Sequence, residues 1–405
     1  MIKRSLVAVV LSATSILHLS AQDIVVQSII DALQIDSMIH YVEEISGETP
    51  IDIGNGPELI VNRNKFNPGN AVAQAYLEQK LTQFGYTPTV QTFSATGGNV
   101  VATKVGSLYP DEYVVLCAHF DALPAGTGPA PAADDDGSGT GALLEAARVL
   151  HDIPFAYSIV FGFWDEEEQG LVGSAFWAGS QAANDVVIKG VVNMDAIAYD
   201  GNADRKARVH VRPIANSLDI SDTVVAVLDR YNFDIDLIVT NPGATYSDHA
   251  SFWNEGYGAV LMIEEFTNDG NPTYHTQNDR VEFFDVPYYE ELAKLSIASF
   301  AILAIPYGLP TAVSEIAVSK PTLFAFPNPA SVDAQLWLDV PVSDRYSIRL
   351  VDALGKEVAL LHDGVLAQGK HVIQLPMASV APGTYSVQAR PENGKAINLR
   401  VMRAF

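Results

Sequence analysis

The spacing of hydrophobic residues predicts two helical segments near the start of the chain. In residues 24–47 and again in residues 70–85, apolar positions recur at intervals of three and four, which is the period of an amphipathic helix. In the second segment Asn70 is expected to cap the helix and Gly85 to end it. The expected apolar face consists of Val72, Tyr76, Leu77, Leu81 and Phe84.

Four later segments have the composition of buried strands. They are short, nearly continuous apolar runs at residues 112–120, 157–164, 186–194 and 257–266, with helical patterns such as residues 139–152 between them. Apolar runs that alternate with helices are typical of a mostly parallel sheet covered on both faces. The sequence therefore predicts an α/β domain over residues 22–308, with a mostly parallel central sheet flanked by helices.

The pattern changes after residue 308. Residues 309–325 are rich in Pro, Ser, Ala and Thr and are interpreted as a linker. Residues 326–405 contain short alternating strands broken by Gly and Pro, which predicts a small C-terminal β-sandwich.

The first residues and the net charge favour an exported protein. Residues 1–21 combine Lys3 and Arg4, a short apolar run and small residues up to Ala21, which is the pattern of a secretory signal peptide cleaved after Ala21. The run is too short for a transmembrane anchor, and no later segment could span a bilayer. The formal net charge of −24 argues against nucleic acid as a partner. The single cysteine, Cys117, is interpreted as a buried structural thiol.

Acidic and imidazole side chains follow the predicted strands. His119 and Asp121 come at the end of the first apolar run, Glu167 and Glu168 after the second, and Asp195 after the third; His275 lies beyond the fourth. Because ligands bind outside the carboxyl ends of the strands in open α/β sheets, these side chains are expected to converge.

The charge expected at this edge of the sheet indicates a metal site. Carboxylates crowded together cost several kcal/mol unless a positive charge neutralises them. Two imidazoles among the acids favour a transition metal over calcium, which prefers oxygen ligands. The set is too large for one tetrahedral zinc ion and suits two zinc ions that share a carboxylate.

Other motifs carry less weight. The stretch GSGTGA at residues 137–142 fits a dinucleotide-binding loop, but the three aspartates directly before it would repel a pyrophosphate. Residues 200–204, DGNAD, suit either a surface calcium turn or a plain solvated loop, and the loop is preferred. The sequence has no His-Glu-x-x-His and no Gly-x-Ser-x-Gly motif, which excludes those two hydrolase templates.

Six motifs in order resemble the co-catalytic zinc aminopeptidase family, whose relatives include glutamate carboxypeptidases and glutaminyl cyclases. They are AHFDA, ADDDGSG, DEEEQGLVGS, NMDA, SDHASF and YHT. The resemblance implies two Zn²⁺ per chain, one held by His119, Asp135 and Asp195 and the other by Asp135, Glu168 and His275. It also implies that Asp135 bridges the ions and that a cis peptide bond follows it.

The resemblance also suggests roles for residues around these ligands. Glu167 matches the general base, and Asp121 matches the acid that orients the imidazole of His119. Some relatives use a tyrosine three residues before the Ser-Asp-His motif to stabilise the oxyanion, but this chain has Ala244 there. Tyr246 is the candidate substitute. Glu264 is a candidate to bind the α-ammonium group of a substrate or, alternatively, a structural residue.

The C-terminal region resembles the sorting domain of the type IX secretion system. The motifs are FPNPAS, IRLVDALGKEV and APGTYSVQ, at residues 326–331, 348–358 and 381–388. The resemblance implies the outer-membrane secretion machinery as a partner and a secreted or cell-surface location. The alternative is an accessory β-sandwich that binds carbohydrate.

The leading hypothesis is a secreted, zinc-dependent exopeptidase, namely an aminopeptidase that removes N-terminal residues from peptides. The alternatives within the same fold are a glutaminyl-peptide cyclotransferase and a carboxypeptidase. A catalytically silent surface-binding protein is the alternative from another class.

Overall fold

The computed structural model describes residues 21–306, 322–330, 334–340, 343–352, 355–392 and 396–404. Two units make up the chain, one comprising Val25–Glu315 and the other containing Ile316–Phe405. Residues 1–20 of the expected signal peptide and residues 309–321 of the expected linker lie outside the described residues. No helix in the described part of the chain has both the length and the apolar composition needed to cross a membrane.

An eight-stranded sheet organises the first unit, with strand order β1-β2-β4-β3-β5-β8-β6-β7. The four central strands, β4, β3, β5 and β8, run parallel to one another, whereas β2 and β6 pair antiparallel on either side of them. The predicted mostly parallel sheet is therefore confirmed. The strands are β1 (Thr89–Thr92), β2 (Gly98–Lys104), β3 (Tyr109–His119), β4 (Tyr157–Trp164), β5 (Val187–Met194), β6 (Lys206–His210), β7 (Asp236–Thr240) and β8 (Ala259–Glu264).

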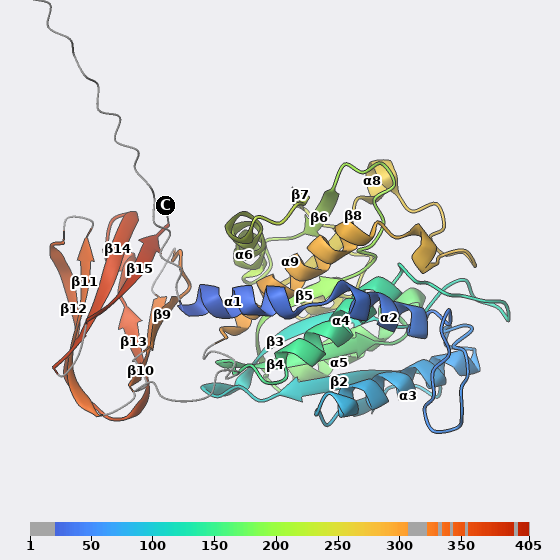
Figure 1. Ribbon diagram of the computed structural model, residues 1–405, viewed down its shortest axis with the longest axis horizontal. Coiled ribbons are helices and arrows are strands. Elements are labelled where there is room, and N and C mark those ends of the chain that lie inside the picture. Colours follow the sequence, from blue (N-terminus) through green and yellow to red (C-terminus); the bar gives the residue numbers. More distant parts are fainter. Residues whose placement is uncertain are drawn as a thin grey trace, which may run out of the picture. The chain divides into compact units, whose positions relative to one another are not determined.

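Helices cover both faces of this sheet, and Figure 1 shows α4 and α9 lying across its central strands. Successive strand residues point to opposite faces. In β4, Phe161 packs on Phe300 of α9, while Trp164 packs on Trp177 of α5 and Phe252 of α7. The helices are α1 (Ala21–Ala32), α2 (Ile35–Ile45), α3 (Pro68–Gln83), α4 (Gly137–Leu150), α5 (Val172–Ala183), α6 (Ser217–Tyr231), α7 (His249–Asn254), α8 (Phe266–Asp269) and α9 (Val286–Ala304).

The expected start of α3 is wrong. The helix begins at Pro68, whose ring suits the first helical position, and Asn67 is the residue before it. Asn70 is buried, and its amide donates to the carbonyl of Arg63 and to Oδ1 of Asp165 instead of capping the helix. Gly85 follows the helix with a φ of +98°, as expected of a residue that ends one.

The second unit is an antiparallel sandwich of a three-stranded sheet, β13-β10-β9, and a four-stranded sheet, β12-β11-β14-β15. Its core is formed by side chains from both sheets, such as Leu336, Ile348 and Val387. The first strand begins at Thr322, inside the segment expected to be linker, because it pairs with β10. The strands are β9 (Thr322–Phe326), β10 (Ala334–Val340), β11 (Asp344–Asp352), β12 (Glu357–Leu366), β13 (Gly369–Leu375), β14 (Gly383–Pro391) and β15 (Ile397–Arg403).

A fully buried arginine, Arg63, ties together three segments that lead to the carboxyl edge of the sheet. Its guanidinium donates to the carbonyls of Ile45, Phe120, Pro131 and Ala132 at 2.6–2.9 Å. Burial lowers its pKa to about 10, and nearby carboxylates such as Asp279 and Asp121 counteract this effect. The guanidinium therefore remains charged at neutral pH.

We predict that Arg63→Met lowers the free energy of unfolding of the first unit by about 3 kcal/mol or more, because it leaves several buried carbonyls without a donor. Chemical denaturation would measure the change. The control is Lys294→Met, which breaks an i,i+4 pair with Glu290 and should cost only about 0.5 kcal/mol. Equal stabilities for the two variants would contradict the role assigned to Arg63.

Candidate metal centre

The chemistry-bearing residues converge at the carboxyl ends of the central parallel strands. His119 is the last residue of β3, Asp195 follows β5, and Glu167 and Glu168 open the short 3₁₀ helix η1 (Glu167–Gln169) after β4. Asp135 lies two residues before the start of α4, and His275 lies six residues after the end of α8. The structure thus brings together all five residues expected to bind metal, and it places the expected base, Glu167, beside them.

Asp135 lies between the two imidazoles. Its Oδ1 is 3.1 Å from Nε2 of His119, and its Oδ2 is 2.9 Å from Nε2 of His275. Glu168 approaches the second imidazole, with Oε2 at 3.1 Å from Nε2 of His275. Each oxygen of one carboxylate therefore faces a separate group of donors, which is the arrangement that a bridging ligand requires.

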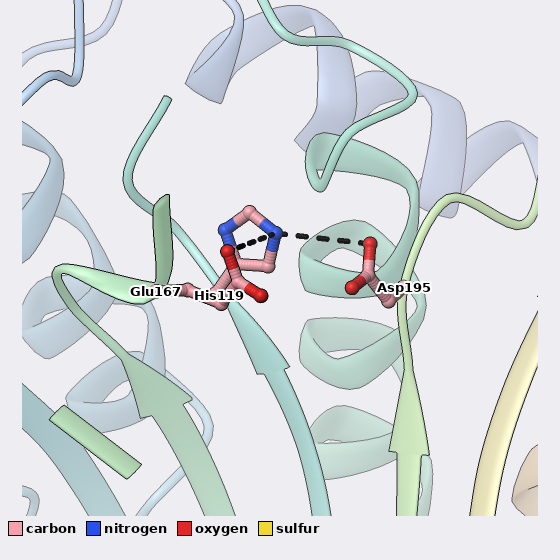
Figure 2. Close-up of side chains that lie close together, drawn as sticks. All are labelled: His119, Glu167 and Asp195. Carbon is pink, nitrogen blue, oxygen red and sulfur yellow. Dashed lines mark ion pairs between the residues drawn. The ribbon is translucent and has the colours of Figure 1, made fainter. Parts of the chain in front are cut away.

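The first group of donors surrounds His119. Figure 2 shows Glu167, His119 and Asp195 approaching from three separate segments, with ion pairs from the imidazole to both carboxylates. Nε2 of His119 is 3.7 Å from Oδ1 of Asp195 and 4.0 Å from Oε2 of Glu167. Asp135 is nearer to the imidazole than Glu167 is. The ligand atoms of His119, Glu167 and Asp195 all lie within 4.8 Å of one another. The shorter distance from Nε2 of His119 to Asp135 nevertheless favours Asp135 over Glu167 as its co-ligand.

The donor set fits divalent cations. Among the described residues, Oδ2 of Asp135, Oε1 of Glu168 and Nε2 of His275 are buried atoms without a hydrogen-bond partner, although they lie close to other polar atoms. Burial raises the pKa of Glu167 well above its usual range, and Asp248 and Asp195 raise it further, against the lowering effect of His119. Bound cations would be coordinated by these unpartnered oxygen and nitrogen atoms and would stabilise the ionised carboxylates.

Asp121 connects the imidazole to the segment that carries the two glutamates. Its Oδ1 lies 3.4 Å from Nδ1 of His119 and accepts a 2.9 Å hydrogen bond from the backbone N–H of Glu167. Its Oδ2 accepts from the N–H of Glu168 and from the amide of Gln169. One carboxylate therefore lies beside the ring and holds the backbone of Glu167 and Glu168 through hydrogen bonds.

The aspartates on either side of Asp135 bind backbone amides. Asp136 caps α4 by accepting from Gly139 N, and it also accepts from the N–H groups of His119 and Ala196. Asp134 accepts from Ala198 N and from the side-chain amide of Asn271. The peptide bond between Asp135 and Asp136 is cis, as the resemblance implied.

Asp279 is a part of the site that the sequence did not reveal. It is buried, and its two oxygens accept from the backbone N–H groups of Asp134 and Asp135 at 3.1 Å. Its only sequence signal is its place four residues after His275. Arg63 was missed for a similar reason, since its four acceptors lie far away along the chain.

Tyr246 lies beside a neutral histidine. Nδ1 of His210 accepts from the backbone N–H of Ala244, so the ring proton is on Nε2, which lies 3.4 Å from the hydroxyl of Tyr246. Burial lowers the pKa of His210 to about 4 and raises that of Tyr246 to about 12. Tyr246 as a whole residue is 54 % exposed, although its hydroxyl group lies in a more buried position beside His210.

Glu264 does not join the metal donors. It is fully buried, accepts from Tyr199 N at 2.9 Å, and has its pKa raised well above the usual range by burial and by Asp134. These contacts favour the structural alternative for this residue over a contact with substrate.

The acidic turn at residues 200–204 is a hydrogen-bonded loop. Asp200 accepts from the N–H groups of Asp204 and Arg205, and Asp204 pairs with Lys206 at 2.7 Å. The carboxylates are thus already used within the loop, in agreement with the preferred alternative.

Comparison with known proteins finds a family model that matches part of each unit. A model of Peptidase family M28 matches residues 99–299, and one of the Secretion system C-terminal sorting domain matches residues 325–402. Leucine aminopeptidase 1 of Trichophyton equinum is 34 % identical over 218 residues, which cover 51 % of this chain and 58 % of that protein. The chain thus spans less than two thirds of the length of this relative.

Two solved structures share the fold. The LapA aminopeptidase of Legionella pneumophila has a TM-score of 0.59 and 23 % identity, covering 73 % of this chain and 78 % of that one. The glutaminyl cyclase of Porphyromonas gingivalis has a TM-score of 0.55 and 19 % identity, covering 66 % and 98 %. The common fold extends across proteins named for different reactions, so it does not by itself choose between them.

The buried acids predict how stability depends on pH when metal is absent. Burial raises the pKa of Asp134 to about 6 and that of Asp165, Glu168 and Asp248 each to about 7. In an unfolded chain these groups titrate near pH 4 (about 3.9 for Asp and 4.3 for Glu). The folded state therefore binds more protons between about pH 4 and 7, and stability falls as the pH rises through this range. The lowered pKa values of His210 and His249 oppose this trend, but they are fewer.

With a chelator present, the first unit should therefore melt at a higher temperature at pH 5.5 than at pH 8. Excess zinc should remove or reverse this difference, because metal binds the deprotonated ligands. Thermal unfolding at the two pH values, with chelator or with zinc, would measure both effects. A chelated protein that is equally or more stable at pH 8 would be inconsistent with the assigned pKa shifts.

Proposed function

Residues 99–299 belong to peptidase family M28, and on this basis we propose that the chain is an exported zinc aminopeptidase that hydrolyses N-terminal residues from peptides. The observation that carries the proposal is the placement of Asp135, with one oxygen toward His119 and the other toward His275. The name of the fungal relative, leucine aminopeptidase, supports the same reaction.

In the proposed site His119, Asp135 and Asp195 hold one zinc ion, and Asp135, Glu168 and His275 hold the other. When bound, the two ions supply Lewis acidity that makes a water molecule acidic and polarises a carbonyl oxygen. Asp121 keeps the imidazole of His119 in place, and the ring of Tyr274 stacks on His275 with centroids 3.7 Å apart.

Glu167 is the proposed general base. It accepts a proton from the attacking water and returns it to the departing amine. Its raised pKa suits this exchange, because a base must hold the proton between the two steps. Tyr246 is the proposed donor to the substrate carbonyl. With Nε2–H of His210 directed at the Tyr246 oxygen, the hydroxyl proton is free for that contact.

Export is the proposed destination of the chain. The C-terminal domain belongs to a sorting family, which indicates handling by a secretion system. The predicted signal peptide would direct the chain across the inner membrane, and the sorting domain would direct it across the outer one.

Metal content tests the proposed ligand sets. The purified protein should contain about two zinc ions per chain, and His275→Ala should retain about one because the His119 group remains. Elemental analysis after dialysis against trace zinc would measure this. His40→Ala, at a half-exposed histidine away from the donors, should keep both ions. A His275→Ala protein with undiminished zinc would refute the second ligand set.

Glu167→Gln tests the reaction and its base together. The variant should keep its zinc but lose about 10²- to 10⁴-fold in kcat, because it removes the proton acceptor and preserves the shape of the side chain.

The assay uses aminoacyl chromogenic substrates and a peptide with N-terminal Gln. Release of free glutamine identifies a peptidase, whereas release of ammonia with a cyclised peptide identifies the cyclase alternative. Cleavage from the C-terminus, or no turnover with zinc bound, would favour the carboxypeptidase or the binding protein.

A further inference from the structure

Glu166, the residue directly before the proposed base, has an unusual backbone conformation. Its φ of +59° and ψ of +31° lie in the left-handed region, which residues other than glycine rarely adopt. It connects the end of β4 and Asp165 to η1, where Glu167 is the first residue. The direction in which the chain turns here decides where the Glu167 side chain lies.

The side chain of Glu166 is held by two other segments of the chain. Oε2 pairs with Nζ of Lys65 at 2.9 Å, and Oε1 accepts from the hydroxyls of Ser94 and Thr96, each at 3.1 Å. The Glu166 side chain is 3 % exposed and that of Lys65 is 21 % exposed. Lys65 precedes α3, while the two hydroxyls belong to the turn between β1 and β2. Such a desolvated, charge-assisted contact holds its geometry better than a solvated surface pair.

The backbone on both sides of Glu166 is also fixed. Its N–H donates to Oδ1 of Asp165 at 2.9 Å, and its carbonyl accepts from Val172 N at 3.1 Å. Beyond it, Asp121 accepts from the N–H groups of Glu167 and Glu168. The left-handed residue is thus the joint between β4 and a segment that Asp121 holds beside the metal donors.

We propose that Lys65 and Glu166 are positioning residues for Glu167. Their ion pair holds the left-handed turn, so that the Glu167 carboxylate stays beside His119 and Asp195 at a fixed orientation. The proposal rests on the proposed role of Glu167 as general base. Neither residue of the pair is among the metal donors. Weakening the pair should therefore lower kcat and leave KM nearly unchanged, because proton transfer depends most steeply on this orientation. Zinc content should stay nearly unchanged, because Asp135 and His275 remain in place beside Glu168.

The chain offers a matched control in a second ion pair of similar burial. Lys80 pairs with Glu44 at 2.7 Å, with side chains 16 % and 11 % exposed, and joins α3 to α2 away from the metal donors. Lys65→Met should lower kcat about tenfold, whereas Lys80→Met should leave kcat unchanged at a comparable loss of stability. Lys65→Arg, which keeps the charge, should recover most of the activity. Equal kcat values for the two methionine variants would overturn the proposal.

Glu166→Gly separates the ion pair from the backbone conformation. Glycine adopts a positive φ without strain but cannot pair with Lys65. We expect this variant to lose kcat as Lys65→Met does. A wild-type kcat in the Glu166→Gly variant would show that the left-handed turn does not need the ion pair with Lys65, and it would overturn the proposal.

Hydrogen exchange provides a readout that needs no substrate. In the zinc-loaded, full-length protein, a peptide covering residues 165–172 should exchange its amides faster in Lys65→Met than in the wild type or in Lys80→Met. Unchanged exchange in Lys65→Met would refute the positioning role even if the peptidase activity is confirmed. Conversely, if the wild-type protein hydrolyses no aminoacyl substrate, the proposed function fails while the exchange data still decide whether the pair orders this segment.

Discussion

Negative charge gathered at the buried carboxyl edge of the sheet is the constraint on which the site depends. Asp121, Asp135, Glu167 and Asp195 are all nearly inaccessible to solvent there, with His119 as the nearest buried imidazole. Ionised carboxylates cannot be crowded together in a protein interior without positive charge, donated hydrogen bonds or protonation. Some of these acids accept donated hydrogen bonds, whereas others keep buried oxygens with no hydrogen-bond donor.

The division follows from what each carboxylate contacts. Asp121, Asp136 and Asp279 accept backbone N–H groups, and through these bonds they fix the segments that carry the metal donors. Asp135 and Glu168 retain buried oxygens with no donor. Burying the acids that accept backbone N–H groups costs little free energy, because these hydrogen bonds replace their bonds to water. The same acids hold Asp135 and Glu168 in fixed positions. A preorganised set of unsatisfied oxygens is what a tightly held dication requires.

The two units solve separate physical problems. The first buries a parallel sheet between helices and delivers polar side chains to one edge of it. The second has its own core between two antiparallel sheets, with residues such as Leu338 and Leu350 contributed from both. Since the second unit has a core of its own, its sequence can change without altering the core of the first unit. The proposed chemistry and the proposed sorting signal therefore lie in separate units.

The sequence alone predicted the central strands, the parallel sheet and the candidate metal ligands, because apolar periodicity and short motifs are properties of neighbouring residues. It also gave the sandwich, from strands broken by Gly and Pro. Only the tertiary structure decided that the side chain of Asn70 bonds to Asp165 instead of capping the helix. It also decided that Glu264 is buried and that Glu166 pairs with Lys65. These outcomes depend on partners far away along the chain, as in the bond from Asp134 N to Asp279, where 145 residues separate donor and acceptor. No local pattern encodes such a partner, because burial and chain packing select it.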